Sequence, residues 1–404
     1  MPNLAEQNSC TGCGACANSC KHDAILMKED TEGFLSPTIN VSKCVECKLC
    51  EKACPSLVGV SFGADKPATF AMWSYKDRRV SSSGGAFSAF ARYILKKGGI
   101  VFGAAYDTYG LRHIETDTIE GLDGMRGSKY IQSTIGDVYK RVKVYLKSDR
   151  WVLFTGTPCQ IAGLKAYLKK DYDTLLTLDL ACHGVPSSKI FESYLRKLEK
   201  RLGFAENALC LENYEFRRRD GWGFAPSVST ASSCQNLFGV DALYMEAFNA
   251  CALFRESCYQ CDYARLPRVG DCTIADFWGI GRYGVRFQHS TRKGVSLVLA
   301  NTDKGRAVIN ELEDVFVEKR SLAEALIENH NLKAVSRKHP RRNEIVSEFL
   351  SKDTSLDEIN QRYHLVDTSA KARIKAWATK TGIFDFAKAV YDMYRVYKGR
   401  LSVS

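Results

Sequence analysis

The sequence predicts a multidomain protein of mixed α+β and α/β class, with a small cysteine-rich module over residues 1–60, an α/β body and a C-terminal helical segment. Two observations predict this organisation. Eight of the sixteen cysteines precede residue 55, and short apolar strands alternate with helical stripes from residue 68 onward. At 404 residues the chain exceeds the usual size of one domain, so we expect several domains with a substantial core.

The N-terminal module contains two cysteine runs of identical spacing, C-x2-C-x2-C-x3-C, at residues 10–20 and 44–54. This is the spacing of bacterial two-cluster ferredoxins, in which the last cysteine of each run ligates the cluster of the other run. The spacing therefore predicts a ferredoxin-like module with two 4Fe-4S clusters. The expected ligands are Cys10, Cys13, Cys16 and Cys54 for cluster one, and Cys44, Cys47, Cys50 and Cys20 for cluster two.

Structural zinc and disulfide bonds are the other common uses of cysteine. Four-cysteine zinc sites use paired C-x2-C elements rather than triple runs, and disulfides belong to oxidising compartments. The sequence shows neither a signal-peptide pattern nor an apolar run of about 18 residues, so we expect a cytoplasmic protein. Between the two runs, residues 24–28 and 34–40 flank a polar turn and predict a β-hairpin.

The net charge of +11 is unevenly distributed. Residues 1–60 hold five lysines and seven acidic residues, a net −2, so the remainder of the chain carries +13. Such a basic body suits anionic ligands such as phosphates, or an acidic partner protein. The chain shows no zinc-finger, recognition-helix or aromatic-basic RNA signature, so we expect no nucleic-acid partner.

The first part of the body, residues 61–145, places a turn of small residues between a strand and a helix. The strand is expected at 68–75, and the helix begins near Ser83, Gly84 and Gly85. Free backbone N–H groups at such a helix start suit a phosphate or pyrophosphate. A capped helix start without a ligand explains the turn equally well. Neither the G-x-G-x-x-G fingerprint nor a P-loop occurs here.

A second strand is expected at 99–105, followed by a loop at 125–133 that is rich in hydrogen-bond donors. Ser128, Lys129 and Gln132 lie in this loop and could bind an anionic or heteroaromatic ligand. A solvated loop is an equal explanation for them.

The second part of the body, residues 146–335, contains a βαβ unit. A strand at 151–155, a helix from Pro158 and a strand at 175–180 predict two parallel strands. Cys159 and Cys182 then lie at the carboxyl ends of neighbouring strands, the edge where open α/β sheets bind ligands. Because Cys159 stands at a helix N-terminus, we expect its thiol to have a lowered pKa.

The C-x2-C pair Cys258 and Cys261 is weak evidence by itself. Together with Cys159 and Cys182 it gives four thiolates, the number that a third 4Fe-4S cluster requires. Among the remaining cysteines, Cys251 and Cys272 have apolar neighbours and are interpreted as buried small hydrophobes, whereas Cys210 and Cys234 stay unassigned.

The C-terminal segment, residues 336–404, is expected to be basic and helical. Residues 371–400 hold eight Lys or Arg and two Asp, interleaved with apolar and aromatic residues. Such a segment can lie on an anionic membrane surface or dock a partner. We favour the simpler interpretation, a terminal helical pair packed against the body.

From residue 81 onward, six motifs in order resemble the coenzyme F-420 hydrogenase/dehydrogenase beta-subunit family. The motifs span residues 82–88, 127–133, 156–164, 182–187, 258–261 and 270–279. With the ferredoxin-like module in front, the resemblance covers about residues 1–335. Members of this family bind FAD in an α/β fold of their own and hold a 4Fe-4S cluster beside it.

The resemblance implies a site residue by residue. It implies that the pyrophosphate of FAD contacts Ser83, Gly84 and Gly85. Other parts of FAD would contact Ser128, Lys129 and Gln132. The third cluster would be held by Cys159, Cys182, Cys258 and Cys261. Cys272 stands where relatives often carry an aliphatic residue, so it is not expected to be a ligand. Near this site, His183 and Asp276 are candidates for proton handling, although a structural hydrogen bond is the role we favour for each.

The function implied is that of an iron–sulfur flavoprotein oxidoreductase. It would move electrons between the ferredoxin-type clusters and FAD, and so reduce or oxidise a small-molecule or deazaflavin-like substrate with the help of an electron donor or acceptor protein. The alternative is an electron-transfer and docking subunit of a larger redox complex, with the basic C-terminal helices as its interface. The sequence leaves open the substrate, the direction of electron flow and the oligomeric state.

Overall fold

A computed structural model describes residues 1–217, 222–230, 234–283, 285–367 and 369, together with a few positions of the C-terminal segment. Those positions are Ala378, Phe386, Ala387, Val390, Met393 and Tyr394. The helical pair predicted for residues 371–400 therefore lies outside the described residues, apart from these positions. None of the helices in the described part of the chain is long and apolar enough to cross a bilayer.

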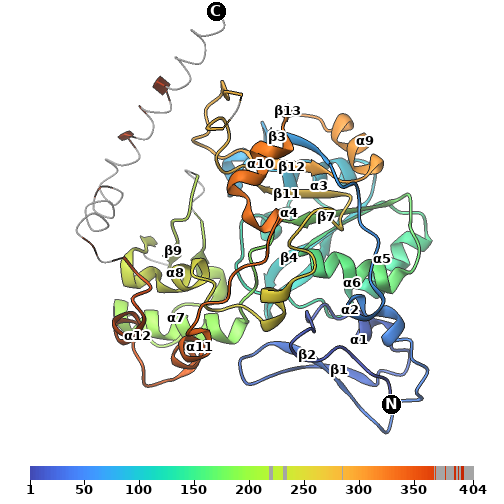
Figure 1. The fold of residues 1–404 in the computed structure, drawn as a ribbon, viewed down its shortest axis with the longest axis horizontal. Coiled ribbons are helices and arrows are strands. Elements are labelled where there is room, and N and C mark those ends of the chain that lie inside the picture. The colour runs from blue at the N-terminus through green and yellow to red at the C-terminus, as the bar shows by residue number, and fades with distance from the viewer. Residues whose placement is uncertain are drawn as a thin grey trace, which may run out of the picture.

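The N-terminal module is a small unit of two short helices and one hairpin (Figure 1). Its elements are α1 (Ala15–Ser19), β1 (Ile25–Glu29), β2 (Leu35–Ile39) and α2 (Pro55–Val58). The strands pair antiparallel with Ile25 opposite Ile39, which confirms the predicted hairpin. Its turn is closed by Asp30, whose carboxylate accepts the backbone N–H groups of Glu32 and Phe34, each at 2.9 Å.

An eight-stranded mixed sheet forms the centre of the body, in the order β13-β3-β12-β11-β7-β6-β4-β5. The strands are β3 (Ala68–Ser74), β4 (Ile100–Asp107), β5 (Gly110–Thr116), β6 (Val152–Gly156), β7 (Leu175–Leu180), β11 (Cys272–Asp276), β12 (Ser296–Ala300) and β13 (Val315–Arg320). The four middle strands, β11, β7, β6 and β4, run parallel, and the outer pairs are antiparallel. The predicted parallel pairing of residues 151–155 with 175–180 is confirmed.

Helices cover both faces of this sheet because its strands bury alternate residues in opposite directions. Leu153 packs with α3 (Ala86–Lys96), α4 (Leu122–Met125) and α9 (Asp303–Glu311). Val152 and Phe154 pack with α5 (Val138–Lys147) and α6 (Pro158–Leu168). A third apolar cluster joins Ala71 and Leu297 to α10 (Leu322–Glu328).

A second unit with an aromatic core lies beside the sheet (Figure 1). It contains α7 (Ser188–Leu202), β8 (Tyr214–Glu215), β9 (Ser227–Ser229), β10 (Cys234–Asn236), α8 (Leu243–Asn249), α11 (Arg342–Leu350) and α12 (Leu356–Tyr363). Phe191, Tyr194 and Tyr244 are fully buried at its centre. The helices α11 and α12 agree with a helical C-terminal segment as far as residue 363.

A buried ion pair fixes the end of β7, where the chain turns towards Cys182. Arg268 and Asp179 are 1% and 0% exposed, with Nη2 and Oδ1 2.9 Å apart. Asp179 also accepts the hydroxyl of Thr273 at 2.7 Å and the N–H of Gly270 at 2.7 Å. Arg268 donates to the carbonyls of Leu180 and Tyr263. The pair thereby ties β7 to the segment that follows Cys261.

Replacing Arg268 by Met should lower the free energy of unfolding by about 3–5 kcal/mol, because Asp179 would be left as an uncompensated buried charge. Arg282→Met is the matched control, since Arg282 pairs with Glu328 at the surface and such pairs contribute about 0–1 kcal/mol. Anaerobic guanidinium denaturation measures both values. Equal losses for the two variants would contradict the structural role given to Arg268.

Candidate functional site

Four cysteines from three separate segments of the body line one open cavity. Cys159 lies in the first turn of α6, directly after β6, and Cys182 lies two residues after β7. Cys258 lies in the short 3-10 helix Glu256–Gln260, and Cys261 follows that helix. The structure thus brings together the four predicted ligands at the carboxyl edge of the parallel strands.

The expectation of a lowered pKa for Cys159 is wrong. Burial raises the pKa of its thiol to about 11, and the neighbouring Cys261 adds to the rise. Burial likewise raises the pKa of Cys258 to about 12. The helix N-terminus does not compensate for this loss of solvation. A bound metal cation would favour the thiolate form of such thiols.

The cysteines of the N-terminal module lie in two groups in the structure. Cys20, Cys44, Cys47 and Cys50 line one open cavity. In the other set, burial raises the pKa of Cys16, and the proximity of Cys13, Cys10 and Cys54 adds to the rise. None of these eight cysteines forms a disulfide bond.

Two of the cysteine sets each place four cysteines around one cavity. Over the described residues, no three His, Cys, Asp or Glu side chains lie close enough to hold one metal ion. A 4Fe-4S cluster takes four separate thiolates, which is the number of cysteines that line each of these cavities.

The first cysteine set of the module adjoins the cavity of the body. Cys13 is part of the same buried apolar cluster as Tyr139 of α5 and Ile161 of α6. Gly163 of α6 faces it so closely that an added Cβ would lie 3.0 Å from Cys13 Sγ. Thr11 lines the body's cavity beside Cys159. The module and the body therefore share a packed interface at the point where their cysteine sets meet.

Arg255 crosses this interface. It is 2% exposed and lines the body's cavity. Its Nε donates to the carbonyl of Cys10 at 2.7 Å, and its Nη2 donates to the carbonyl of Leu35 at 2.8 Å. Sequence reasoning assigned it no role, although its position three residues before Cys258 was a signal that could have identified it. Arg255 thus places a buried positive charge between two cysteine sets.

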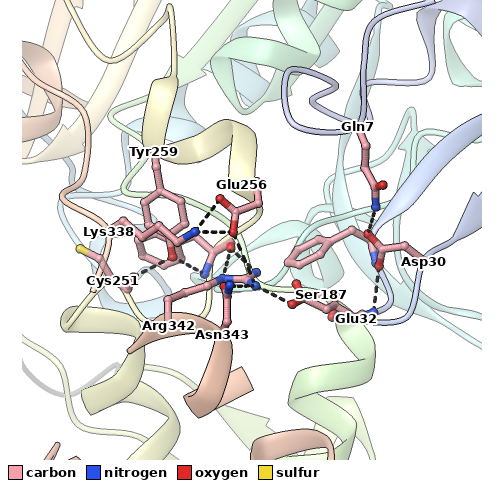
Figure 2. Close-up of polar contacts among 12 residues, drawn as sticks. Gln7, Asp30, Glu32, Ser187, Cys251, Glu256, Tyr259, Lys338, Arg342 and Asn343 are labelled. Carbon is pink, nitrogen blue, oxygen red and sulfur yellow. Dashed lines mark hydrogen bonds and ion pairs between the residues drawn. The ribbon is translucent and has the colours of Figure 1, made fainter. Parts of the chain in front are cut away.

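Arg342 of α11 makes a second connection, shown in Figure 2. Its Nη1 lies 2.5 Å from Glu32 Oε1 in the module's hairpin turn, and its Nη2 donates to the carbonyl of Phe254 at 2.7 Å. Ser187 donates its hydroxyl to the Glu32 carbonyl at 2.5 Å. Lys338 pairs with Glu256 nearby at 2.8 Å. The turn of the module is thereby docked on the C-terminal part of the chain.

The predicted pyrophosphate site lies at the start of α3. The helix begins after Gly85, which has a φ of +88°, and no side chain caps its N-terminus. The hydroxyl oxygen of Ser83 is buried without a hydrogen-bond partner. Gly84 packs so closely that an added Cβ would lie 2.3 Å from the carbonyl oxygen of Met72. An orphan hydroxyl beside an uncapped helix start fits a phosphate-containing ligand.

Of the three predicted ligand-binding residues in the loop at 125–133, only some lie near the start of α3. The N–H of Ser128 donates to the hydroxyl of Ser82 at 2.9 Å. Lys129 Nζ donates to the carbonyl of Arg126 at 2.9 Å in the same loop. Gln132 instead contacts the module and Arg255, with Nε2 2.9 Å from the Thr11 carbonyl and Oε1 3.3 Å from Arg255 Nη1.

The two candidates for proton handling lie in different places. His183 lines the four-cysteine cavity, with Nδ1 2.9 Å from Asn331 Oδ1 and Nε2 3.5 Å from the sulfur of Cys251. Asp276 forms an ion pair with the buried Arg217 and accepts the indole N–H of Trp222 at 2.6 Å. Both side chains make specific hydrogen bonds.

The fold and the cysteine sets define an iron–sulfur protein of the electron-transfer class. Residues 9–58 match the family model of the 4Fe-4S dicluster domain. Residues 149–324 match the family model that describes the C-terminal part of the beta subunit of coenzyme F420 hydrogenase/dehydrogenase. These matches confirm the ferredoxin-like module and the resemblance recognised from the sequence motifs.

A distant similarity to one solved structure accompanies these matches. One chain of the F420-reducing NiFe hydrogenase complex from Methanosarcina barkeri, from a xenon-derivatised structure, is similar at 16% identity and a TM-score of 0.45. The similarity covers 72% of this chain and 95% of that chain. The comparison with curated proteins gave no match.

Replacing Arg342 by Met should loosen the module, because Glu32 loses its cation and the Phe254 carbonyl loses a donor. We expect limited proteolysis between residues 56 and 67 to become at least about threefold faster, since breaking a buried charge contact costs several kcal/mol. Arg341→Met is the adjacent control, because Arg341 is exposed and pairs with Glu344 within its own helix turn. Identical cleavage rates in both variants would argue against a docking role.

Proposed function

We propose that this protein is an iron–sulfur flavoprotein oxidoreductase. In this proposal the module holds two 4Fe-4S clusters, and FAD binds at the start of α3. A third cluster is bound by Cys159, Cys182, Cys258 and Cys261. One observation carries the proposal. Four cysteines from three segments line a single cavity, and that cavity adjoins the first cysteine set of the module. The module could serve as a route for electrons to and from the body.

Arg255 and Gln132 support this assignment of the third site. The guanidinium of Arg255 lies among the cysteines and lowers the pKa of Cys159 and Cys258 against the larger effect of burial. A nearby positive charge favours thiolates over thiols and stabilises a reduced cluster relative to an oxidised one. Gln132 orients Arg255, because its side-chain oxygen accepts a hydrogen bond from Arg255 Nη1.

The loop at 126–133 supports placing a flavin close to this third site. Ser128 of the loop contacts the turn that precedes α3, whereas Gln132 contacts Arg255 at the cavity. Four residues of chain span at most about 14 Å, so the Cα atoms of Ser128 and Gln132 lie within that distance of each other. When bound, FAD exchanges two electrons with an organic substrate and single electrons with clusters.

The chain's own residues would bind and orient this flavin. Ser83 offers its unpartnered hydroxyl, and the free N–H groups at the start of α3 offer further donors. Asp77 holds the surrounding turns together, because its carboxylate accepts hydrogen bonds from Arg92 at 2.8 Å and from Arg126 at 2.7 Å. The substrate proposed is a small molecule or a deazaflavin-like cofactor, with His183 and Asp276 as candidates for proton handling.

Iron analysis after anaerobic reconstitution tests the third cluster. The wild-type protein should contain about 12 iron atoms per chain, and Cys258→Ala should contain about 8, because one of four thiolates is lost. Cys210→Ala is the control, since Cys210 is exposed and lines neither of the two cavities. Eight irons in the wild-type protein would refute the third cluster.

Flavin content provides a separate test. Ser83→Leu should reduce bound FAD from about one per chain to less than about a tenth, because a bulky apolar side chain would replace the orphan hydroxyl at the crowded start of α3. Its iron content should stay at the wild-type value. Ser148→Leu, at an exposed position after α5, should leave both contents unchanged. Full flavin occupancy in Ser83→Leu would exclude this location.

A further inference from the structure

Lysines of the module lie close to lysines at helices α5 and α6 of the body. We call this group the lysine face; its members are Lys21, Lys140, Lys143, Lys147, Lys169 and Lys170. All of these except the half-buried Lys143 are exposed. They come from three parts of the chain, namely the end of the first cysteine run, helix α5 and the C-terminal end of α6.

These lysines lie close enough to repel one another. The pKa of Lys143 is lowered by partial burial and by the nearby charges of Lys147, Lys169, Lys21 and Lys170. Asn18 of α1 fixes the module against α5, because its amide donates to the carbonyl of Gly136 at 2.7 Å. Figure 1 shows α5 and α6 directly above α1 and α2. The module and the body therefore jointly form one positive surface.

Few acidic groups neutralise the lysine face. Asp23 pairs with Lys140 at 3.6 Å, and Asp137 pairs with Arg141 at 3.2 Å. Asp171 and Asp173 follow Lys170 at one edge. A like-charge group of this kind costs stability, so a surface that keeps it is well suited to an anionic partner.

The second cysteine set reaches the surface at the border of this face. Lys21 directly follows Cys20, and Lys48 and His22 line the cavity of this set. Cys47 is exposed, and Val45 beside it is 59% exposed. Exposed apolar side chains next to separated charges are typical of weak, transient redox interfaces.

We propose that the lysine face is the docking surface for a small acidic electron-carrier protein, which exchanges electrons with the cluster held by Cys20, Cys44, Cys47 and Cys50. The proposal rests on the proposed function for the use of those electrons. In each encounter the reduced carrier loses one electron and the cluster gains one, and no bond is formed or broken. A lipid surface or a nucleic acid would match the charge but would not explain its position beside an exposed redox site.

The test uses the reconstituted holoprotein and a reduced acidic ferredoxin, mixed anaerobically in a stopped-flow instrument. The variant is Lys143→Glu/Lys147→Glu/Lys170→Glu, which leaves Lys21 intact because Lys21 adjoins a cluster ligand. At low ionic strength its second-order rate constant should fall at least tenfold, because electrostatic steering raises association rates by about 10–1,000-fold. The wild-type rate constant should fall steeply with added salt, and that of the variant should not.

The control is Lys200→Glu/Lys319→Glu/Lys352→Glu, which makes the same change in net charge at exposed positions on α7, on β13 and after α11. Its rate constant should stay within about twofold of wild type, because those charges are far from the docking surface and are screened. Iron content and cluster midpoint potentials should be unchanged in both variants. A wild-type protein that binds no clusters would count against the proposed function, whereas wild-type clusters with an unaltered rate in the lysine-face variant would count against the docking surface.

Two results would overturn the docking proposal. One is an equal rate constant and an equal salt dependence for the wild-type protein and the lysine-face variant. The other is an unchanged rate constant in that variant together with lost binding to phosphatidylglycerol vesicles or to duplex DNA. The latter would assign the lysine face to a membrane or a nucleic acid.

Discussion

The contact between Arg255 and the module's backbone is the interaction on which the proposed electron route depends. The guanidinium of Arg255 donates hydrogen bonds to the carbonyls of Cys10 and Leu35, and Arg255 also lines the four-cysteine cavity. These hydrogen bonds go to backbone carbonyls and not to a flexible side chain, and backbone carbonyls cannot move independently of the fold. The bonds therefore fix the position of the first cysteine set. Because a buried cation must be fully hydrogen-bonded, the arrangement also holds Arg255 itself in one position.

Burial shapes the chemistry of the cysteines in the same way. Loss of solvation raises the pKa of Cys159 and Cys258 and so favours neutral thiols. The positive charge of Arg255 acts in the opposite direction at both cysteines. In the proposed third site, iron would add to this effect, because a metal cation deprotonates a coordinating thiol.

Local patterns predicted much of the fold and the cysteine sets. The hairpin, the βαβ unit and the positions of Cys159 and Cys182 followed from periodicity and from the geometry of parallel strands. The pKa of Cys159 was mispredicted, because its helix position is visible in the sequence whereas its burial beneath the module is not. Gln132 shows the same limit. Its loop was recognised, but only the docked module determines that its amide contacts Thr11 and Arg255.

The different exposure of the two module sets gives the sites an order in space. Cys10, Cys13 and Cys16 are buried, and Cys13 packs against α6, whereas Cys47 is exposed. In the proposed electron route, the second set would serve an external partner, and the first set, which packs against the body, would serve internal transfer. The two sets contain the same number of cysteines but lie in different surroundings, because the module packs against the body beside the first set.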